Sequence, residues 1–430
     1  MRIERLHVEN FRSIRSLDLT DIPDIAVFYG PNGSGKSNVL AAIDAFWRLL
    51  ESGAGIRFAT VAPVPAPWFG IEDAPYGGHA GITVFDGDVD LGEKRIDVDG
   101  WITQHLSVRF HVTVTPKGKA TMVVEKSATR PTIPGLLRSL GQGFLSEAQW
   151  SKWSNSVLQA LSAGWMLVPE LRGVPVKDGD ETDAIAVALT GNFEKAAFLA
   201  HTSPDVRQSV HLGKLQEVLA RPPLNRPPFR TVRYPDGRYA IQEIHQDRAA
   251  SYGVSLDRAG LGIRQIYTIL GCIVLSGAPI VGIEEPEAHL HALTSGKDLR
   301  DILRGLVPDT VNQLFVATHS ELFDLDPTGY YDVRLDPERG TVVERRTDLA
   351  DIDRRHTYMP GAARHALIDA LNRGEPDRFV FERPDGTGIR ASEMRDMLVR
   401  DDRDALAFLE TITDAAVRLV TLKTDAKLRR

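Results

Sequence analysis

The sequence predicts an α/β protein built on a mixed β-sheet, and three patterns support this. An apolar run, IAVFY, is followed by a glycine-rich turn and then by NVLAAIDAFWRLL, whose apolar residues recur at helical spacing. A second apolar strand, PIVGI, precedes another helix and a third strand, LFVATHS. Hairpin patterns with alternating apolar residues stand between these segments. Apolar strands joined by helices are typical of a parallel sheet, and hairpins add antiparallel strands.

Composition narrows the class of protein further. The chain has 430 residues, 43% of them apolar and 25% charged, which suits a soluble globular protein of two or three structural units. The net charge of −7 gives no support to a surface that binds nucleic acid throughout. Cys272 is the single cysteine, so no disulfide can form within the chain. The N-terminus lacks the apolar core of a signal peptide, and we expect a cytoplasmic protein.

One uncharged segment, residues 266–283, approaches the length of about 20 residues that crosses a membrane. The break SGAP at residues 276–279 divides it into a buried helix and a buried strand, because glycine and proline interrupt regular structure. We therefore expect no membrane contact.

The first half of the chain is expected to alternate between strands and loops before it becomes helical. MRIERLHVENF and SIRSLDL read as strands, and IAVFYG as a third. Residues 51–100 are rich in Gly, Pro and Asp, which predicts loops with short strands. Residues 107–128 predict a hairpin around PKGK, and residues 134–220 are mostly helical in pattern.

The second half begins with a hairpin at residues 230–244, around Asp236 and Gly237. A helix from about residue 261, a strand at 279–284, another helix and the strand at 314–320 follow. The highly charged residues from 341 onward predict no definite architecture. We expect four parts: an N-terminal lobe at 1–133, a mostly helical insertion at 134–229, a C-terminal lobe at 230–345, and a charged extension at 346–430.

Residues 30–37 read GPNGSGKS, with the spacing of a P-loop. The glycines let backbone N–H groups point at phosphate oxygens, Lys36 would reach the β- and γ-phosphates, and Ser37 would bind Mg²⁺. The alternative is a chance glycine-rich turn, but the flanking strand and helix are the context that the motif requires. The predicted nucleotide-binding residues are Gly30, Pro31, Asn32, Gly33, Ser34, Gly35, Lys36, Ser37 and Asn38.

Two carboxylates end the strand PIVGI and complete the predicted chemistry. Glu284 would hold the metal ion together with Ser37, and Glu285 would act as the general base that polarises water. His319, at the tip of the next strand, could contact the γ-phosphate. Taken alone, the acids suit a solvated turn and the histidine an ordinary surface or core residue. Together with Lys36, they form the predicted catalytic set.

Gly260 and Gly262 open a helix in AGLGIRQ, where free N–H groups could receive a phosphate. A tight turn is the alternative reading of these glycines. The long separation between the lysine and the acidic strand predicts a large insertion, which residues 51–255 supply.

The segments NFRSI, GPNGSGKSN, AGLGIRQ, IEEPEAHLH and ATHS resemble, in this order, ABC-type ATPases of the SMC, RecF and OLD kind. The closest resemblance is to OLD-like prokaryotic AAA-type ATPases, many of which occur in anti-phage defence or DNA maintenance. It covers residues 1–50 and 250–325, and WMLVPELRG at 165–173 resembles a further strand of these ATPases.

The resemblance implies a head-type ATPase fold with an antiparallel subdomain. It implies that residues 30–37 form Walker A, that Glu284 and Glu285 end Walker B, and that His319 is the switch histidine. Gly260 and Gly262 would belong to the signature motif, which reaches the ATP of a second subunit. ATP and Mg²⁺ would then be sandwiched in a homodimer that closes on binding and opens on hydrolysis.

The sequence departs from the family pattern in several places. Gly260 stands at the position where the family usually has the signature serine. Ala292 stands at the position where a proline often follows the Leu-His pair. Gln104 is a weak candidate for the Q-loop glutamine. No long coiled-coil arm is visible, which argues against an SMC-like tether, and no acidic cluster after His319 predicts a TOPRIM nuclease. Arg172 could line the nucleotide or form a structural ion pair.

Basic residues alternate with aromatic ones in RPPLNRPPFRTVRYPDGRY. Arg226, Arg230 and Arg233 could follow a nucleic-acid backbone, which makes DNA a candidate partner, although a solvated hairpin is the favoured reading. Trp150 and Trp153, three positions apart, suit packing better than recognition.

Three functions are therefore considered. The first is an OLD-like, ATP-hydrolysing dimer that acts as a switch or clamp on a partner effector encoded nearby, in anti-phage defence. The second is a RecF-like DNA-repair ATPase. The third is a nucleotide-dependent scaffold with little turnover, against which the intact acid pair argues.

Overall fold

The computed structural model divides the chain into two units, Met1–Arg354 and Arg355–Arg430. It describes residues 1–52, 64–70, 73, 82–97, 100–115, 119–132, 155, 157–168, 183–189, 192–246, 251–288, 290, 297–320, 325, 329–336, 338–346, 371, 378–382, 387–399 and 405. The four-part division expected from the sequence stays a prediction.

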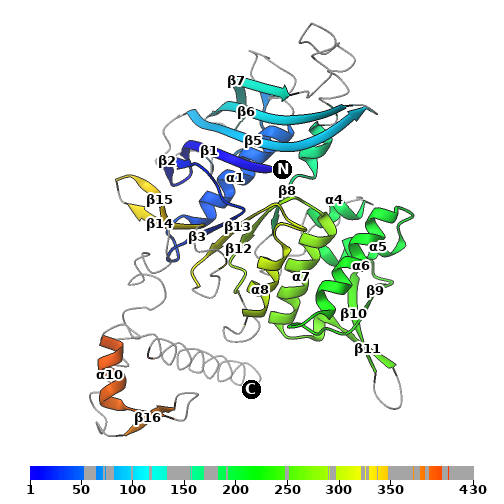
Figure 1. Cartoon of the computed structure of the whole chain (residues 1–430), viewed down its shortest axis with the longest axis vertical. Helices are drawn as coiled ribbons and strands as arrows, with labels where there is room; N and C mark the ends of the chain where they lie inside the picture. The colour runs from blue at the N-terminus through cyan, green and yellow to red at the C-terminus, as the bar shows by residue number, and fades with distance from the viewer. Residues whose placement is uncertain are drawn as a thin grey trace. The chain divides into compact units, whose positions relative to one another are not determined.

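The first unit contains a mixed sheet of 12 strands in the order β4-β7-β6-β5-β1-β2-β15-β14-β3-β13-β12-β8 (Figure 1). One end, here called the parallel half, consists of β14 (Tyr330–Asp336), β3 (Ile25–Tyr29), β13 (Gln313–Thr318), β12 (Ile280–Glu284) and β8 (Trp165–Val168). The rest, the antiparallel half, consists of β15 (Gly340–Arg346), β2 (Ile14–Leu19), β1 (Arg2–Phe11), β5 (Ile82–Asp97), β6 (Gly100–Val114), β7 (Ala120–Thr132) and β4 (Val64–Pro65). The predicted fold class, α/β with a mixed sheet, is confirmed.

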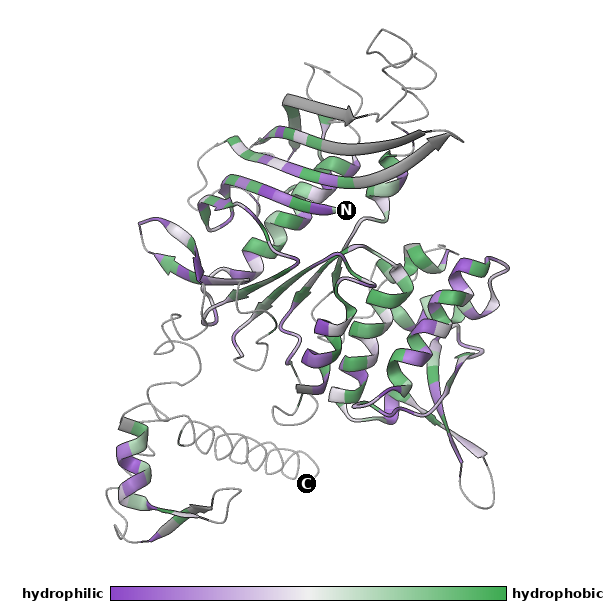
Figure 2. Ribbon diagram, viewed as in Figure 1, coloured by the Kyte–Doolittle hydropathy of each residue, from purple (hydrophilic) through white to green (hydrophobic). Residues whose placement is uncertain are grey.

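The parallel half is buried on both faces. Helix α1 (Lys36–Glu51) packs on one face, where Phe28 and Phe315 point into the core that α1 shares with the antiparallel half. The opposite face, with Val27 and Val316, packs against a helical layer. That layer consists of α4 (Ala184–Leu189), α5 (Phe193–Thr202), α6 (Val206–Ala220), α7 (Leu261–Ser276) and α8 (Lys297–Leu306). Figure 2 accordingly shows β3, β12 and β13 as mostly hydrophobic.

Most predicted elements are confirmed, including the separate helix α7 and strand β12 in the uncharged segment. The hairpin predicted at residues 230–244 is formed by β9 (Phe229–Arg233) and β10 (Tyr239–Gln246). Strand β11 (Ser251–Ser255) extends it to a three-stranded sheet, and a short helical turn, η2 (Leu256–Arg258), leads on to α7.

The expectation of loops with short strands at residues 51–100 is wrong for β5, which is one long strand that pairs with both β1 and β6. Its Asp and Gly residues lower strand propensity, but the pairing uses them. Asp86 forms ion pairs with Arg5 (2.8 Å) and Arg109 (2.6 Å), which lie on the neighbouring strands. Gly87 makes room for Phe46, since a Cβ built there would lie 2.5 Å from that ring.

Two further expectations change. Residues from 341 onward seemed to have no definite architecture, but β15 pairs with β14 and joins the main sheet. Gln104 lies within β6, paired with Gly92 on one side and Pro131 on the other, so its position is in a strand and not in a Q-loop.

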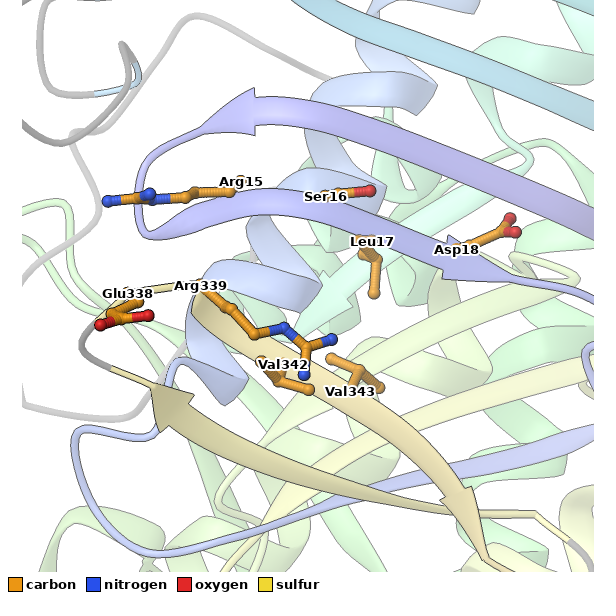
Figure 3. A pocket seen from close by; sticks show the side chains of 8 residues that line it. All are labelled: Arg15, Ser16, Leu17, Asp18, Glu338, Arg339, Val342 and Val343. Atoms are coloured by element: carbon orange, nitrogen blue, oxygen red, sulfur yellow. The ribbon is translucent and has the colours of Figure 1, made fainter.

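The two halves of the sheet meet where β15 pairs with β14, and β15 joins the rest of the antiparallel half through the pair of Gly340 with Ile14 of β2. Next to the pair of Gly340 with Ile14, strands β2 and β15 line a cavity of about 370 Å³ (Figure 3). It is lined by residues 15–18 of β2 and by Glu338, Arg339, Val342 and Val343. Ser13, Gly340 and Thr341, where the N–H of Thr341 donates to the Ser13 carbonyl, are called the vertex below.

The second unit is small among the residues described. It contains β16 (Phe379–Glu382) paired with β17 (Gly388–Arg390), and α10 (Ala391–Val399). Ile389, Met394, Leu398 and Ala405 form its buried cluster.

Candidate nucleotide-binding and hydrolysis site

The phosphate loop connects β3 to α1, as the sequence predicts. Gly33 and Gly35 have φ angles of 80° and 102°, which favour glycine. Gly35 caps α1 without a side-chain hydrogen bond. The first N–H groups of the helix, with its positive dipole end, are therefore available to an anion.

Lys36 lies over its own loop. Its Nζ donates hydrogen bonds to the carbonyl oxygens of Gly30 (2.8 Å) and Pro31 (3.0 Å), and the residue is 5% exposed. Burial lowers the pKa of Lys36, while the nearby charges of Glu285, Glu287 and Glu284 act in the opposite direction. The lysine is therefore close enough to these three carboxylates to interact with their charges, although they lie about 250 residues later in the sequence.

The strand order of the sheet brings the acidic strand to the loop. The neighbouring strands β3, β13 and β12 are parallel, so their carboxyl ends lie at the same edge of the sheet. The Ser37 hydroxyl donates a hydrogen bond to Oε1 of Glu284. A hydroxyl and a carboxylate at one point suit Mg²⁺, which takes oxygen ligands and completes its shell with water and phosphate oxygens. Among the residues described, no cluster of three or more His, Cys, Asp or Glu side chains forms a metal site by itself.

Glu285 has a positive φ of 42°, which is uncommon for a residue with a side chain. Its N–H donates a hydrogen bond to the Ala317 carbonyl of the next strand (2.8 Å). Its Oε1 lies 3.6 Å from Nδ1 of His319. The predicted base and the predicted switch histidine are therefore neighbours, and the backbone at Glu285 is strained where the chemistry is expected.

Glu287 is a further residue of this site that the sequence analysis did not single out. Its Oε1 accepts hydrogen bonds from the Thr318 hydroxyl (2.5 Å) and the His319 N–H (3.2 Å). It also lies 3.4 Å from Nδ1 of His319. Burial raises the pKa of Glu287, whose other oxygen has no hydrogen-bond partner among the described residues. The only feature of the sequence that could have indicated Glu287 was its place in IEEPEAHLH, two residues after the acid pair.

The predicted signature glycines, Gly260 and Gly262, lie at the start of α7. Gly260 caps α7, is exposed, and has open space around it: nothing lies within 4 Å of a Cβ built there. Leu261 beside it is 63% exposed. An exposed helix N-terminus next to an exposed leucine is accessible to a second molecule.

The three arginines proposed for nucleic acid separate into different environments. Arg226 already has a carboxylate partner: its guanidinium forms a bidentate ion pair with Glu243, whose side chain is 4% exposed. Arg230 donates hydrogen bonds to Gln242, and Arg233 lies over the Tyr239 ring; both arginines are exposed. Periodicity could not distinguish them, since the partner of Arg226 comes from β10.

Several predictions fall outside the described residues: those for Arg172, Trp150, Trp153 and Ala292. Among the described helices, none is both long and apolar enough to span a bilayer.

Residues 1–61 match the family model of the AAA ATPase domain. The DNA replication and repair protein RecF of Mesorhizobium japonicum is 37% identical over 90 residues, 21% of this chain and 22% of RecF. RecF of Halalkalibacterium halodurans is 26% identical over 270 residues, 60% of this chain and 70% of RecF. The chain spans only about a quarter of the length of most of the curated relatives that it matches.

Among solved structures, the SMC head domain from Thermotoga maritima aligns with a TM-score of 0.40 at 13% identity, over 80% of this chain and 99% of that chain. The Smc head of Pyrococcus furiosus, bound to the C-terminal domain of ScpA, aligns with a TM-score of 0.44 at 14% identity, over 80% and 96%. The sequence matches support an ABC-class ATPase of the group that includes RecF. The OLD-like subtype and the lack of a nuclease stay predictions.

Proposed function

We propose that this chain binds ATP with Mg²⁺ and hydrolyses it in a dimer of two heads. The observation that carries the proposal is the hydrogen bond from Ser37 to Glu284, which joins the loop to the acidic strand. Lys36 and the loop N–H groups would bind the β- and γ-phosphates. Bound Mg²⁺ would neutralise charge on these phosphates.

In this proposal the remaining residues act on water and on the terminal phosphate. Glu285 polarises the attacking water and takes its proton, and His319 donates a hydrogen bond to the γ-phosphate. Glu287 keeps Thr318 and His319 in place. Gly260 and Gly262 of a second copy cover the nucleotide, in agreement with the exposed N-terminus of α7.

Turnover of the Glu285→Gln variant tests the catalytic assignment. We expect the ATPase rate to fall about 100-fold or more, since general bases contribute 10²–10⁴-fold, while ATP affinity changes little. Glu217→Gln, an exposed carboxylate on α6, is the matched control and should keep the wild-type rate. Equal rates for wild type and Glu285→Gln would exclude Glu285 as the base, and two rates that are both close to zero would favour a scaffold with little turnover.

A mixing experiment tests the sharing of sites between two copies. Lys36→Ala removes the phosphate lysine, and Gly260→Asp places a negative charge at the exposed N-terminus of α7. Each variant alone should be inactive. In a mixture, heterodimers contain one intact composite site, so activity should partly return. If both variants fold but their mixture remains inactive, the site is not shared between two copies.

We further propose, from the resemblance to OLD-like ATPases, that the dimer controls a partner effector in anti-phage defence. Plaque assays with wild type and Glu285→Gln, each expressed with the neighbouring genes, test this. Protection lost with the variant supports the proposal, and equal plaque counts with and without the wild-type genes would overturn it.

A RecF-like role with DNA is the second candidate, and the matches to RecF favour it. It predicts that DNA accelerates ATP turnover and that the effect falls steeply with salt, because phosphate contacts release counterions. Replacing Arg230 and Arg233 by Ala should reduce that salt dependence. Turnover that does not respond to DNA at low salt would exclude this role.

A further inference from the structure

The hairpin β14–β15 forms a wall behind the phosphate loop. A Cβ built on Gly30 would lie 2.2 Å from the carbonyl oxygen of Val333 in β14. A Cβ built on Gly35 would lie 2.1 Å from Oγ1 of Thr341 in β15. The first and last glycines of the loop therefore touch a hairpin that stands about 300 residues later in the chain, and real Cβ atoms do not come so close to other atoms.

Thr341 also begins a chain of hydrogen bonds that returns to α1. Its N–H donates to the Ser13 carbonyl (2.8 Å), and the two hydroxyls are 2.7 Å apart. Asn38 Nδ2 then donates to the Ser13 hydroxyl (2.5 Å). Thr341 is 1% exposed, so its hydroxyl depends on Ser13 for a partner.

The contacts of Thr341 and this chain of hydrogen bonds reach two residues, Gly35 and Asn38. They flank Lys36 and Ser37, which would bind phosphate and metal. Gly35 precedes Lys36 with a φ of 102°, and Asn38 follows Ser37 in the first turn of α1. A glycine-rich loop loses much conformational entropy when it becomes ordered around a ligand. Contacts that order the loop beforehand reduce this cost and so strengthen binding.

We propose that Thr341 is a positioning residue for nucleotide binding: it holds Gly35 by contact and Asn38 through Ser13, so that the loop is ordered before phosphate arrives. The inference rests on the proposed function, in which the loop binds a nucleotide. It assigns a role in the site to β15, which contributes no residue to the predicted nucleotide, metal or catalytic set.

The test compares the affinity of four proteins for Mg-ADP, which avoids turnover. Thr341→Val keeps the shape and removes the hydroxyl, and we expect about tenfold weaker binding, the equivalent of one buried hydrogen bond. Thr341→Ser restores the hydroxyl and should bind nearly as well as wild type. Thr83→Val is the matched control: Thr83 is also 1% exposed, and its hydroxyl donates to the Asn10 carbonyl (2.8 Å). It should bind like wild type.

The outcomes separate the inference from the proposed function. Equal affinity of wild type and Thr341→Val, or an equal loss in Thr83→Val, would overturn the inference alone. If wild type binds no Mg-ADP, the proposed function fails and the inference fails with it. Should Thr341→Val not fold, Ser13→Ala breaks the same chain from the other strand; it should weaken binding similarly, and wild-type affinity in that variant would overturn the inference.

Discussion

The parallel and antiparallel halves of the sheet bury their residues in different ways. In β13 all six residues are buried, whereas in β2 the buried residues Ile14, Leu17 and Leu19 stand among exposed ones. The reason is that helices cover both faces of the parallel half, while one face of β2 meets solvent. Figure 2 shows the contrast as mostly hydrophobic colour in β3, β12 and β13 and mixed colour in β1 and in the coloured part of β5.

This difference explains where polar groups of the candidate site lie. A strand buried on both faces has no room for charged side chains along its length, so they are found where it ends. Glu284 closes β12, His319 follows β13, and the loop of Lys36 follows β3. The antiparallel half contributes something else: a packing contact at the vertex, which orders the loop.

Single aspartate substitutions at neighbouring positions of a strand should change the free energy of unfolding most. Phe315→Asp and Val316→Asp should each cost more than about 4 kcal/mol of unfolding free energy, since both side chains are fully buried. In β2, Leu17→Asp should be similarly harmful, but Ser16→Asp should cost less than about 1 kcal/mol because Ser16 is exposed. Urea denaturation measures all four. Tolerance of either β13 variant would remove the contrast between the halves.

Substitution at the vertex should give the next largest effect. Gly340 has a φ of 74°, and a Cβ built there would lie 2.3 Å from the Ser13 carbonyl oxygen. We expect Gly340→Ala to cost about 3 kcal/mol or more, from backbone strain and the clash. Gly237, in the β9–β10 turn, has a φ of 86° but open space around it, so Gly237→Ala should cost only about 1 kcal/mol. Equal costs in thermal or urea unfolding would show that the vertex is not a close contact.

The smallest effect expected is a pH dependence at the end of the parallel half. Burial raises the pKa of Glu287 above its usual 4.5, so the folded chain holds this proton more tightly than the unfolded chain. The resulting stability is present below pH 4.5 and is lost as pH rises through the folded pKa. Glu287→Gln cannot ionise, so its unfolding free energy should fall less than that of wild type between pH 4.5 and neutral pH.

Glu217→Gln, whose carboxylate is exposed, serves as the control and should follow the wild-type curve. If the curve of Glu287→Gln also runs parallel to that of wild type, Glu287 is not held as a buried acid, and the end of the parallel half is more open to water than its packing indicates.

Local patterns predicted the fold class and most elements because helices, strands and turns leave periodic traces in the sequence. The same patterns were misleading at β5, where Asp86 and Gly87 read as loop residues but are satisfied by arginines and an aromatic ring of other elements. They also treated Arg226 and Arg230 alike, although only the first has a buried carboxylate opposite it.

The sequence by itself determined the phosphate loop, the acid pair and the histidine, because each is a short motif whose chemistry follows from residue type and spacing. Only the tertiary structure decided that Ser37 meets Glu284, that Glu287 orders His319, and that Thr341 closes on Gly35. These contacts depend on the order in which strands pair across the sheet. That order is set by the packing of the whole core, and no local period of the sequence encodes it.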